Sequence, residues 1–166
     1  MATRKKSDSP DPAQAKIPST PTLPGLAKIA KNCQACDLWE RSTQTVFGEG
    51  EPNSKVMFIG EVPGDQEDRA GRPFVGPARQ LLNKALAEAG IDRRKVYVTN
   101  VVAQALLGSD FRGTQHRGEF LDSPLARWVL ATVHPSSILR APDEETRHEE
   151  TRRFIADLKN IAAVIS

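Results

Sequence analysis

Lys55-Val56-Met57-Phe58-Ile59-Gly60 is a short apolar run that ends in glycine, a pattern typical of a buried parallel strand. Residues 77–89 then place leucine and alanine side chains on one helical face, and Gly90 ends this helix. A second apolar strand follows at residues 95–101, Lys-Val-Tyr-Val-Thr-Asn-Val. The order strand, helix, strand predicts a βαβ unit and therefore an α/β fold.

The remaining elements extend this unit on both sides. Helices are expected at residues 26–31, 103–108 and 142–165, a strand edge at 119–121, and a third parallel core strand at 128–133. The last helix is amphipathic, and its inner side carries Phe154, Ile155, Leu158 and Ile161. Residues 101–127 are long enough for a parallel crossover but contain no convincing further strand. The central sheet is therefore expected to be short.

Length and composition indicate one globular domain with an N-terminal tail. The chain has 166 residues, of which 39% are hydrophobic, and no apolar run is long enough to span a bilayer. Residues 1–25 are polar and proline-rich, so we expect a disordered tail before a domain at residues 26–166. The basic start has no apolar segment after it, which favours a cytoplasmic location.

The net charge of +2 comes from the expected tail, because residues 26–166 carry equal numbers of basic and acidic side chains. A nucleic-acid-binding protein is often more basic than this. The charge balance does not exclude DNA as a partner, because a local patch can supply phosphate contacts.

Cys33 and Cys36 are the two cysteines of the chain. A Cys-x-x-Cys pair in an intracellular protein indicates either a pair of metal ligands or a redox dithiol, and a reduced pair without function is the third possibility. As ligands, two thiolates would make half of a four-ligand zinc or iron–sulfur site.

Polar side chains follow all three expected core strands. Glu61 and Asp65 come after the first strand, Asn100 ends the second, and His134 follows the third. The carboxyl ends of parallel strands meet at one edge of a sheet, so these side chains are expected to converge on one crevice. Each residue taken alone also has a structural explanation as a cap, a turn residue or a hydrogen-bonded histidine. Their common position favours a site, in which Gly60 and Gly64 would let the backbone approach a ligand closely.

Four motifs carry a resemblance to a known family. They are Gly60-Glu61-Val62-Pro63-Gly64-Asp65-Gln66-Glu67-Asp68 with Gly71-Arg72-Pro73-Phe74-Val75-Gly76, then Tyr97-Val98-Thr99-Asn100, His134-Pro135-Ser136-Ser137-Ile138-Leu139-Arg140, and Cys33-x-x-Cys36. Together they resemble the family-four, iron–sulfur uracil-DNA glycosylases. Residues 64–68 and 114–119 are similar to the UdgX subgroup, whose members attach covalently to uracil-bearing DNA.

This resemblance implies a three-layer α/β sandwich around a short central parallel sheet, and base-excision repair as the function. Glu61 would activate the attacking group or assist bond cleavage, and His134 would stabilise charge on uracil O2. The substrate-binding residues would be Gly60, Val62, Gly64, Asp65, Phe74, Asn100, Ser136 and Arg140, with Phe74 stacking on the flipped base and Asn100 reading its edge. Cys33 and Cys36 would ligate a [4Fe-4S] cluster, and the partner would be uracil-containing DNA, single-stranded by preference, bound by a monomer.

One departure from the family pattern falls between Val102 and Ala103. The family has a basic loop, a third cysteine, a helix and a core strand at this point, whereas Val102 here runs directly into Ala103-Gln104-Ala105-Leu106-Leu107-Gly108. The UdgX nucleophile and half of the cluster ligands would be lost with that block, together with one core strand. His116 lies in another motif and is not expected to replace the nucleophile. A catalytically inactive DNA-binding remnant is the alternative, and a nucleotide-binding hydrolase on the same kind of sheet is the third hypothesis.

Overall fold

The computed structural model describes residues 17–34, 37–100, 107, 111, 115–124 and 126–165. The chain divides into two compact units, Met1–Thr45 and Val46–Ser166. The helical piece expected at 103–108 lies, except for Leu107, outside the described residues, and so do the Val102–Ala103 junction, Cys36 and most of the expected tail.

The first unit contains helix α1 (Leu23–Ala30) and a short 3-10 helix, η2 (Asp37–Arg41). Helix α1 begins three residues earlier than expected because the Thr22 hydroxyl accepts a hydrogen bond from the Gly25 N–H at 3.2 Å. A threonine N-cap satisfies one of the free amide groups of the first turn, and a proline in that turn needs no such partner. The end of α1 is tied to the end of the unit, since Thr45 Oγ1 donates to the Ala30 carbonyl at 2.8 Å.

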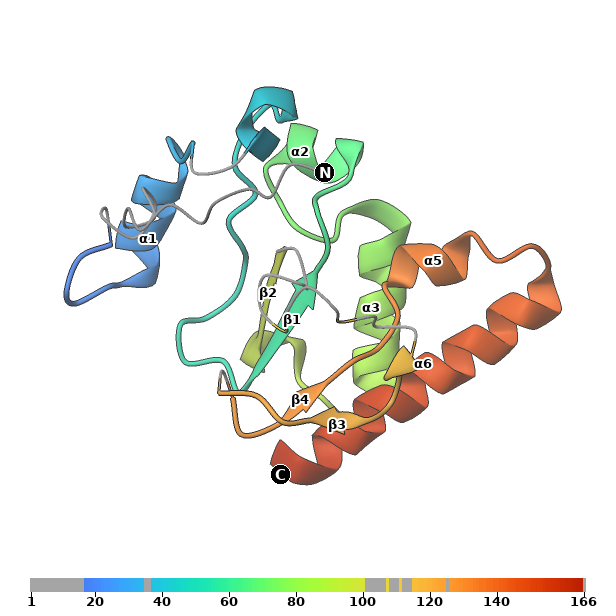
Figure 1. Cartoon of the computed structure of the whole chain (residues 1–166). Coiled ribbons are helices and arrows are strands. Elements are labelled where there is room, and N and C mark those ends of the chain that lie inside the picture. Colours follow the sequence, from blue (N-terminus) through green and yellow to red (C-terminus); the bar gives the residue numbers. More distant parts are fainter. Residues whose placement is uncertain are drawn as a thin grey trace, which may run out of the picture. The chain divides into compact units, whose positions relative to one another are not determined.

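The second unit is built around the expected βαβ motif, which is confirmed. Strands β1 (Val56–Gly60) and β2 (Val96–Asn100) pair in parallel, and helix α3 (Gly76–Glu88) connects them, with the short 3-10 helix η3 (Arg93–Lys95) before β2. The register pairs Gly60 with Asn100, so the two strands end side by side. This is the mixed α/β architecture with a short parallel sheet that the sequence predicted (Figure 1).

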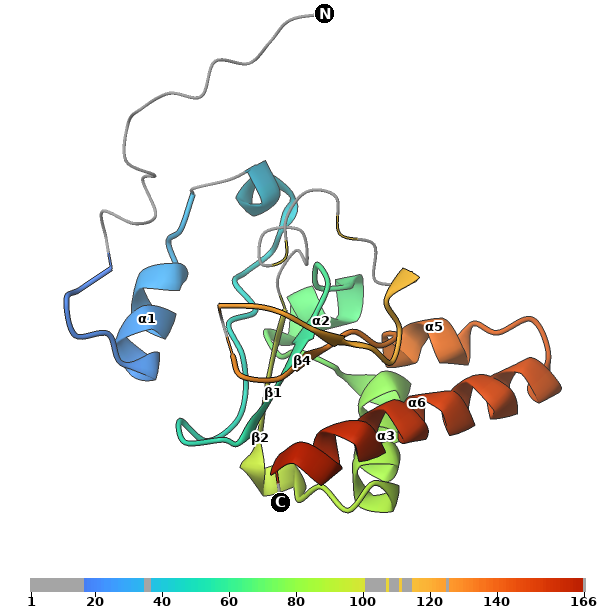
Figure 2. The same ribbon diagram turned by 60° about the horizontal axis from the view of Figure 1, so that its bottom comes forward.

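The core lies between this sheet and the helices. Helix α6 (Glu144–Ile165) packs against α3 and the short helix α5 (Pro135–Leu139), and Figure 2 shows α6 running across α3. Phe154 and Leu158 of α6 are buried, and Ile155 and Ile161 pack against the same core, as the amphipathic pattern predicted. On β1 the alternate residues Met57 and Ile59 are 56% and 44% exposed, so this face of the strand is open to solvent.

The expected third parallel strand at 128–133 is wrong. Strand β4 (Val129–Leu130) pairs antiparallel with β3 (Phe120–Leu121) in a separate two-stranded sheet. The apolar run predicted a strand correctly, but an apolar pattern does not determine which strand is its partner. The neighbouring segment provides that partner here, and the Gly118 N–H donates to the Ala131 carbonyl at 2.8 Å next to it.

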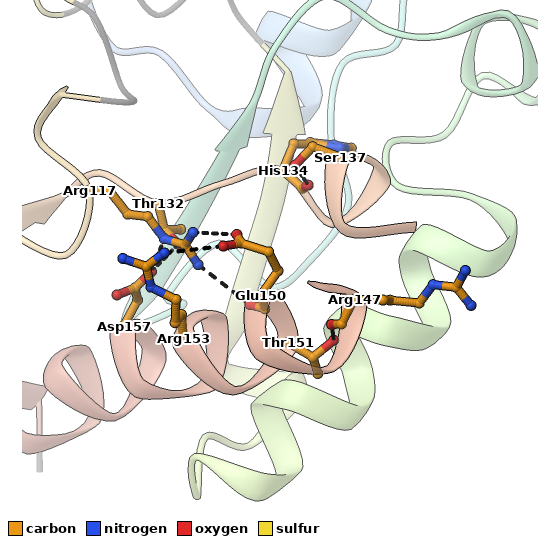
Figure 3. Close-up of polar contacts among 9 residues, drawn as sticks. All are labelled: Arg117, Thr132, His134, Ser137, Arg147, Glu150, Thr151, Arg153 and Asp157. Carbon is orange, nitrogen blue, oxygen red and sulfur yellow. Dashed lines mark hydrogen bonds and ion pairs between the residues drawn. The ribbon is translucent and has the colours of Figure 1, made fainter. Parts of the chain in front are cut away.

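An ion-pair network fastens this antiparallel segment to α6. Arg117, only 14% exposed, bonds Asp157 through Nε at 3.2 Å and Glu150 through Nη1, and Thr132 donates to Asp157 at 2.6 Å (Figure 3). The hydrogen bond from Arg117 lowers the pKa of Glu150. The network therefore links the segment before His134 to the helix that closes the core.

Candidate active site

The end of β1 is where the candidate site is formed. A methyl group added to Gly60 would lie 2.4 Å from Asn100 Oδ1 and 3.0 Å from Phe74 Cε2. Real Cβ atoms do not approach other atoms this closely, so glycine allows the Asn100 amide and the Phe74 ring to meet above the strand end. Two of the expected site residues thus converge on Gly60.

Asn100 presents an unused hydrogen-bond donor at this point. Its Nδ2 atom is buried, and none of the described residues accepts a hydrogen bond from it. A buried amide donor without a partner costs free energy on the order of 1–3 kcal/mol. An unpaired group of this kind fits a ligand with a carbonyl oxygen, because an asparagine side chain can accept and donate side by side to an amide edge.

Phe74 forms a buried wall of the site. Its ring is 4% exposed, and its centroid lies 4.6 Å from that of the His134 ring with an angle of 35° between the planes. The backbone of Phe74 has φ of 50°, the only positive φ of a non-glycine residue in the described part of the chain. Phe74 therefore lies beside both His134 and the Asn100 amide.

His134 is held in a defined orientation by the first turn of α5. Its Nδ1 atom accepts a hydrogen bond from the Ser136 N–H at 3.1 Å, and its carbonyl accepts one from the Ser137 hydroxyl at 2.7 Å, the pair drawn in Figure 3. An Nδ1 that accepts leaves the proton of the neutral ring on Nε2. The ring is thus prepared to donate a hydrogen bond from Nε2.

The charges around His134 act in opposite directions. Burial lowers the pKa of His134, and Arg140 lowers it further, whereas Glu67 and Glu61 raise it. The lowered pKa favours a neutral imidazole at neutral pH. Glu61 is exposed, and its charge, like that of Arg140, acts on the His134 ring.

Other expected site residues have different surroundings. Val62 is 50% exposed, and Asp65 forms an exposed ion pair at 3.2 Å with Arg69 in helix α2 (Asp65–Ala70), a helix that the sequence did not predict. Ser136 contributes the N–H that orients His134, and Gly64 is the N-cap of α2.

Glu67 was not expected as a site residue. Its carboxylate accepts hydrogen bonds from the backbone N–H groups of Gly64 and Phe74. A signal was present in the sequence, because a glutamate three residues after an N-cap position is half of a capping box.

The described residues do not assemble a ligand set for a metal cluster. Cys33 is exposed, and no group of three or more histidine, cysteine or acidic side chains is gathered in the described ranges. A [4Fe-4S] cluster takes about four ligands, and the two cysteines of this chain supply half of that number. The two cysteines present therefore do not fit a [4Fe-4S] cluster held by this chain alone.

Comparison with known proteins finds a family model and curated relatives that are similar to part of this chain. Residues 47–112 match the family model described as the uracil DNA glycosylase superfamily. The chain is 49% identical over 84 residues to the type-4 uracil-DNA glycosylase of Sulfurisphaera tokodaii, covering 48% of this chain and 38% of that protein. It is 50% identical over 80 residues to the type-4 enzyme of Pyrobaculum aerophilum, covering 48% and 41%, and 50% identical over 77 residues to that of Thermotoga maritima, covering 46% and 40%.

The chain therefore spans about two fifths of the length of the curated relatives that it matches. The matched segment contains Gly60, Phe74 and Asn100, the residues that meet at the end of β1. This segment is similar to the uracil DNA glycosylase superfamily, as the sequence motifs predicted.

Proposed function

We propose that the chain recognises uracil flipped out of DNA and cleaves its N-glycosidic bond. The observation that carries this proposal is the unpaired buried Nδ2 of Asn100 beside the Phe74 ring. A flipped uracil would stack on Phe74, donate its N3–H to Asn100 Oδ1 and accept from Nδ2 through O4. Cytosine carries an amino group at that position, so the amide edge discriminates between the two bases.

His134 and Glu61 would share the chemistry. As the C1′–N1 bond breaks, its electron pair moves into the uracil ring and charge develops on O2, which the neutral Nε2–H of His134 would stabilise. A water oxygen then bonds to C1′, and its proton passes to the Glu61 carboxylate. A donor already oriented by Ser136 stabilises such charge without rearrangement.

Several finer points belong to the same proposal. Arg140 and the Ser136–Ser137 turn would contact the DNA backbone, single-stranded DNA would be the preferred substrate, and the protein would act as a monomer in the cytoplasm. Cys33 and Cys36 would not hold a [4Fe-4S] cluster by themselves, because such a cluster takes about four ligands. None of the helices in the described part of the chain has the length and apolar character that crossing a bilayer requires.

The test is incubation with uracil-containing single-stranded DNA, scored for abasic sites and for a covalent adduct that survives denaturing electrophoresis. We expect weak cleavage that is lost in Glu61→Gln and His134→Ala, and no adduct. Asn100→Ala should relax or abolish the preference for uracil over cytosine. Binding of uracil DNA without cleavage would instead support an inactive remnant.

A stable adduct would contradict the expectation that the nucleophile is missing. His116 would then be the first residue to substitute. In the structure the Nδ1 atom of His116 lies 3.2 Å from Glu119 Oε2, and the His116 ring is stacked on the Phe111 ring with centroids 5.8 Å apart.

A further inference from the structure

The carboxylate of Glu67 connects two parts of the candidate site. Its Oε2 accepts a hydrogen bond from the Gly64 N–H at 2.9 Å, and its Oε1 accepts one from the Phe74 N–H. Gly64 follows β1, and Phe74 supplies the buried ring beside His134. The half-buried Glu67 side chain therefore links the loop after β1 to the backbone of Phe74.

Phe74 needs such support because its backbone is strained. At φ of 50° a residue with a Cβ atom meets its own carbonyl group, at a cost of roughly 1–2 kcal/mol. Conformations of this kind persist where the surroundings fix them. A hydrogen bond from an amide to an ionised carboxylate is about twice as strong as a neutral one, so Glu67 is well suited to hold the Phe74 amide.

The loop before Phe74 is fastened independently. Arg72 Nε donates to Glu49 Oε2 at 2.9 Å, and Arg79 of α3 donates to Glu49 Oε1 at 2.6 Å. These bonds act at Arg72, two residues before Phe74. Core residues pack around the Phe74 ring, and the Glu67 hydrogen bond acts on the Phe74 backbone N–H, the group whose direction the φ angle sets.

We infer that Glu67 is a positioning residue of the uracil site, holding Phe74 in its left-handed conformation so that the ring stands against His134 as a stacking surface. The inference rests on the proposed function for its ligand. It differs from a role in capping α2, because a cap would affect stability alone. It differs also from catalysis, because Glu67 acts through Phe74.

The experiment compares Glu67→Ala, Glu67→Gln and the control Glu88→Gln in the full chain. Glu88 is an exposed glutamate at the end of α3, paired loosely with Lys84 at 4.0 Å. Two quantities are measured: the nuclear Overhauser contact between the Phe74 and His134 rings, without ligand, and the affinity for a uracil oligonucleotide. If Glu67→Ala does not fold, Glu67→Gln decides, since it keeps one acceptor oxygen and removes the charge.

We expect Glu67→Ala to lose the ring contact and to weaken uracil binding by on the order of ten- to a hundredfold, with partial rescue in Glu67→Gln. Glu88→Gln should change neither quantity. An Ala variant that keeps the ring contact would overturn the inference, even if it melts at a lower temperature. The contact between the Phe74 and His134 rings is measured without ligand, so it tests the role of Glu67 independently of the proposed function. A wild-type protein that does not bind uracil would overturn the proposed function alone.

Discussion

Gly60 is the residue on which the geometry of the site depends most. Its missing side chain leaves the space in which Asn100 and Phe74 meet, so Gly60→Ala should place a methyl group 2.4 Å from Asn100 Oδ1. We expect this substitution to displace the amide, to lose uracil binding, and to lower stability by about 1–3 kcal/mol.

Gly90→Ala is the matched control for Gly60→Ala. Gly90 has φ of +76°, so alanine is strained there, but a Cβ atom would meet nothing within 4 Å. This control should also lower stability while leaving uracil binding intact. Equal binding by both variants, measured by fluorescence anisotropy beside thermal unfolding, would contradict the proposed packing at the end of β1.

His134 should make the stability of the protein depend on pH. Burial lowers its pKa below the ordinary value of 6.5, so the unfolded chain binds a proton that the folded chain does not. The unfolded state therefore gains protons first on acidification, and stability should fall as the pH drops below about 6.5, until the folded pKa is reached.

Chemical denaturation between about pH 5 and pH 7.5 measures this effect. His134→Gln should flatten the pH dependence relative to wild type and to His148→Gln, which removes an exposed histidine of α6. A His134→Gln variant with the wild-type slope would show that the imidazole is not held neutral by burial.

At the scale of elements, the antiparallel segment depends on its attachment to α6. Asp157 is buried and receives bonds from Arg117 and Thr132 (Figure 3). Asp157→Ala would leave Arg117 with one acidic partner and the Thr132 hydroxyl without its acceptor, and should destabilise the fold by roughly 1–3 kcal/mol, the cost of buried donors that lose an acceptor.

The exposed pair between Arg152 and Glu149 provides the comparison on the same helix. Glu149→Ala should cost less than about 1 kcal/mol, because exposed ion pairs contribute little. Both free energies of unfolding come from denaturant titrations. Similar values for the two variants would mean that the Arg117 network does not fasten the segment.

The elements also show which parts of the structure the sequence could predict. The βαβ unit and α6 follow from apolar periodicity, because each buries one continuous face in a single core. The pairing of Val129–Leu130 could not be predicted, because partner choice is a tertiary property and the apolar pattern is the same for either sheet. Helices α2 and α5 are too short to show the apolar period of an α-helix, so the sequence pattern did not distinguish them from loops.

The candidate site was predicted to a similar extent. Gly60, Asn100 and His134 follow from their positions after expected strands, although His134 reaches the site from a segment outside the parallel sheet. The left-handed conformation of Phe74 and its bond to Glu67 could not be predicted, because both depend on how the loop at 71–75 is fastened. The sequence motifs identified the candidate residues, and their contacts are seen in the structure.

At the scale of the whole molecule, uracil binding and cleavage of the N-glycosidic bond are separable. The residues that would read uracil lie in the segment that matches the superfamily, whereas the matched relatives are about two and a half times as long as this match. One face of β1 is exposed at Met57 and Ile59, as expected for a chain with fewer elements around its sheet. Uracil binding should therefore persist even where cleavage is slow.

The most direct test of this claim is the nuclear magnetic resonance signal of the Asn100 side-chain amide, assigned by its disappearance in Asn100→Ala. We expect uracil to shift this signal, because the unpaired buried Nδ2 gains a carbonyl acceptor, and cytosine at the same concentration to leave it in place. An Asn100 signal that stays in place with uracil, or that moves equally with both bases, would show that Asn100 does not read the uracil edge.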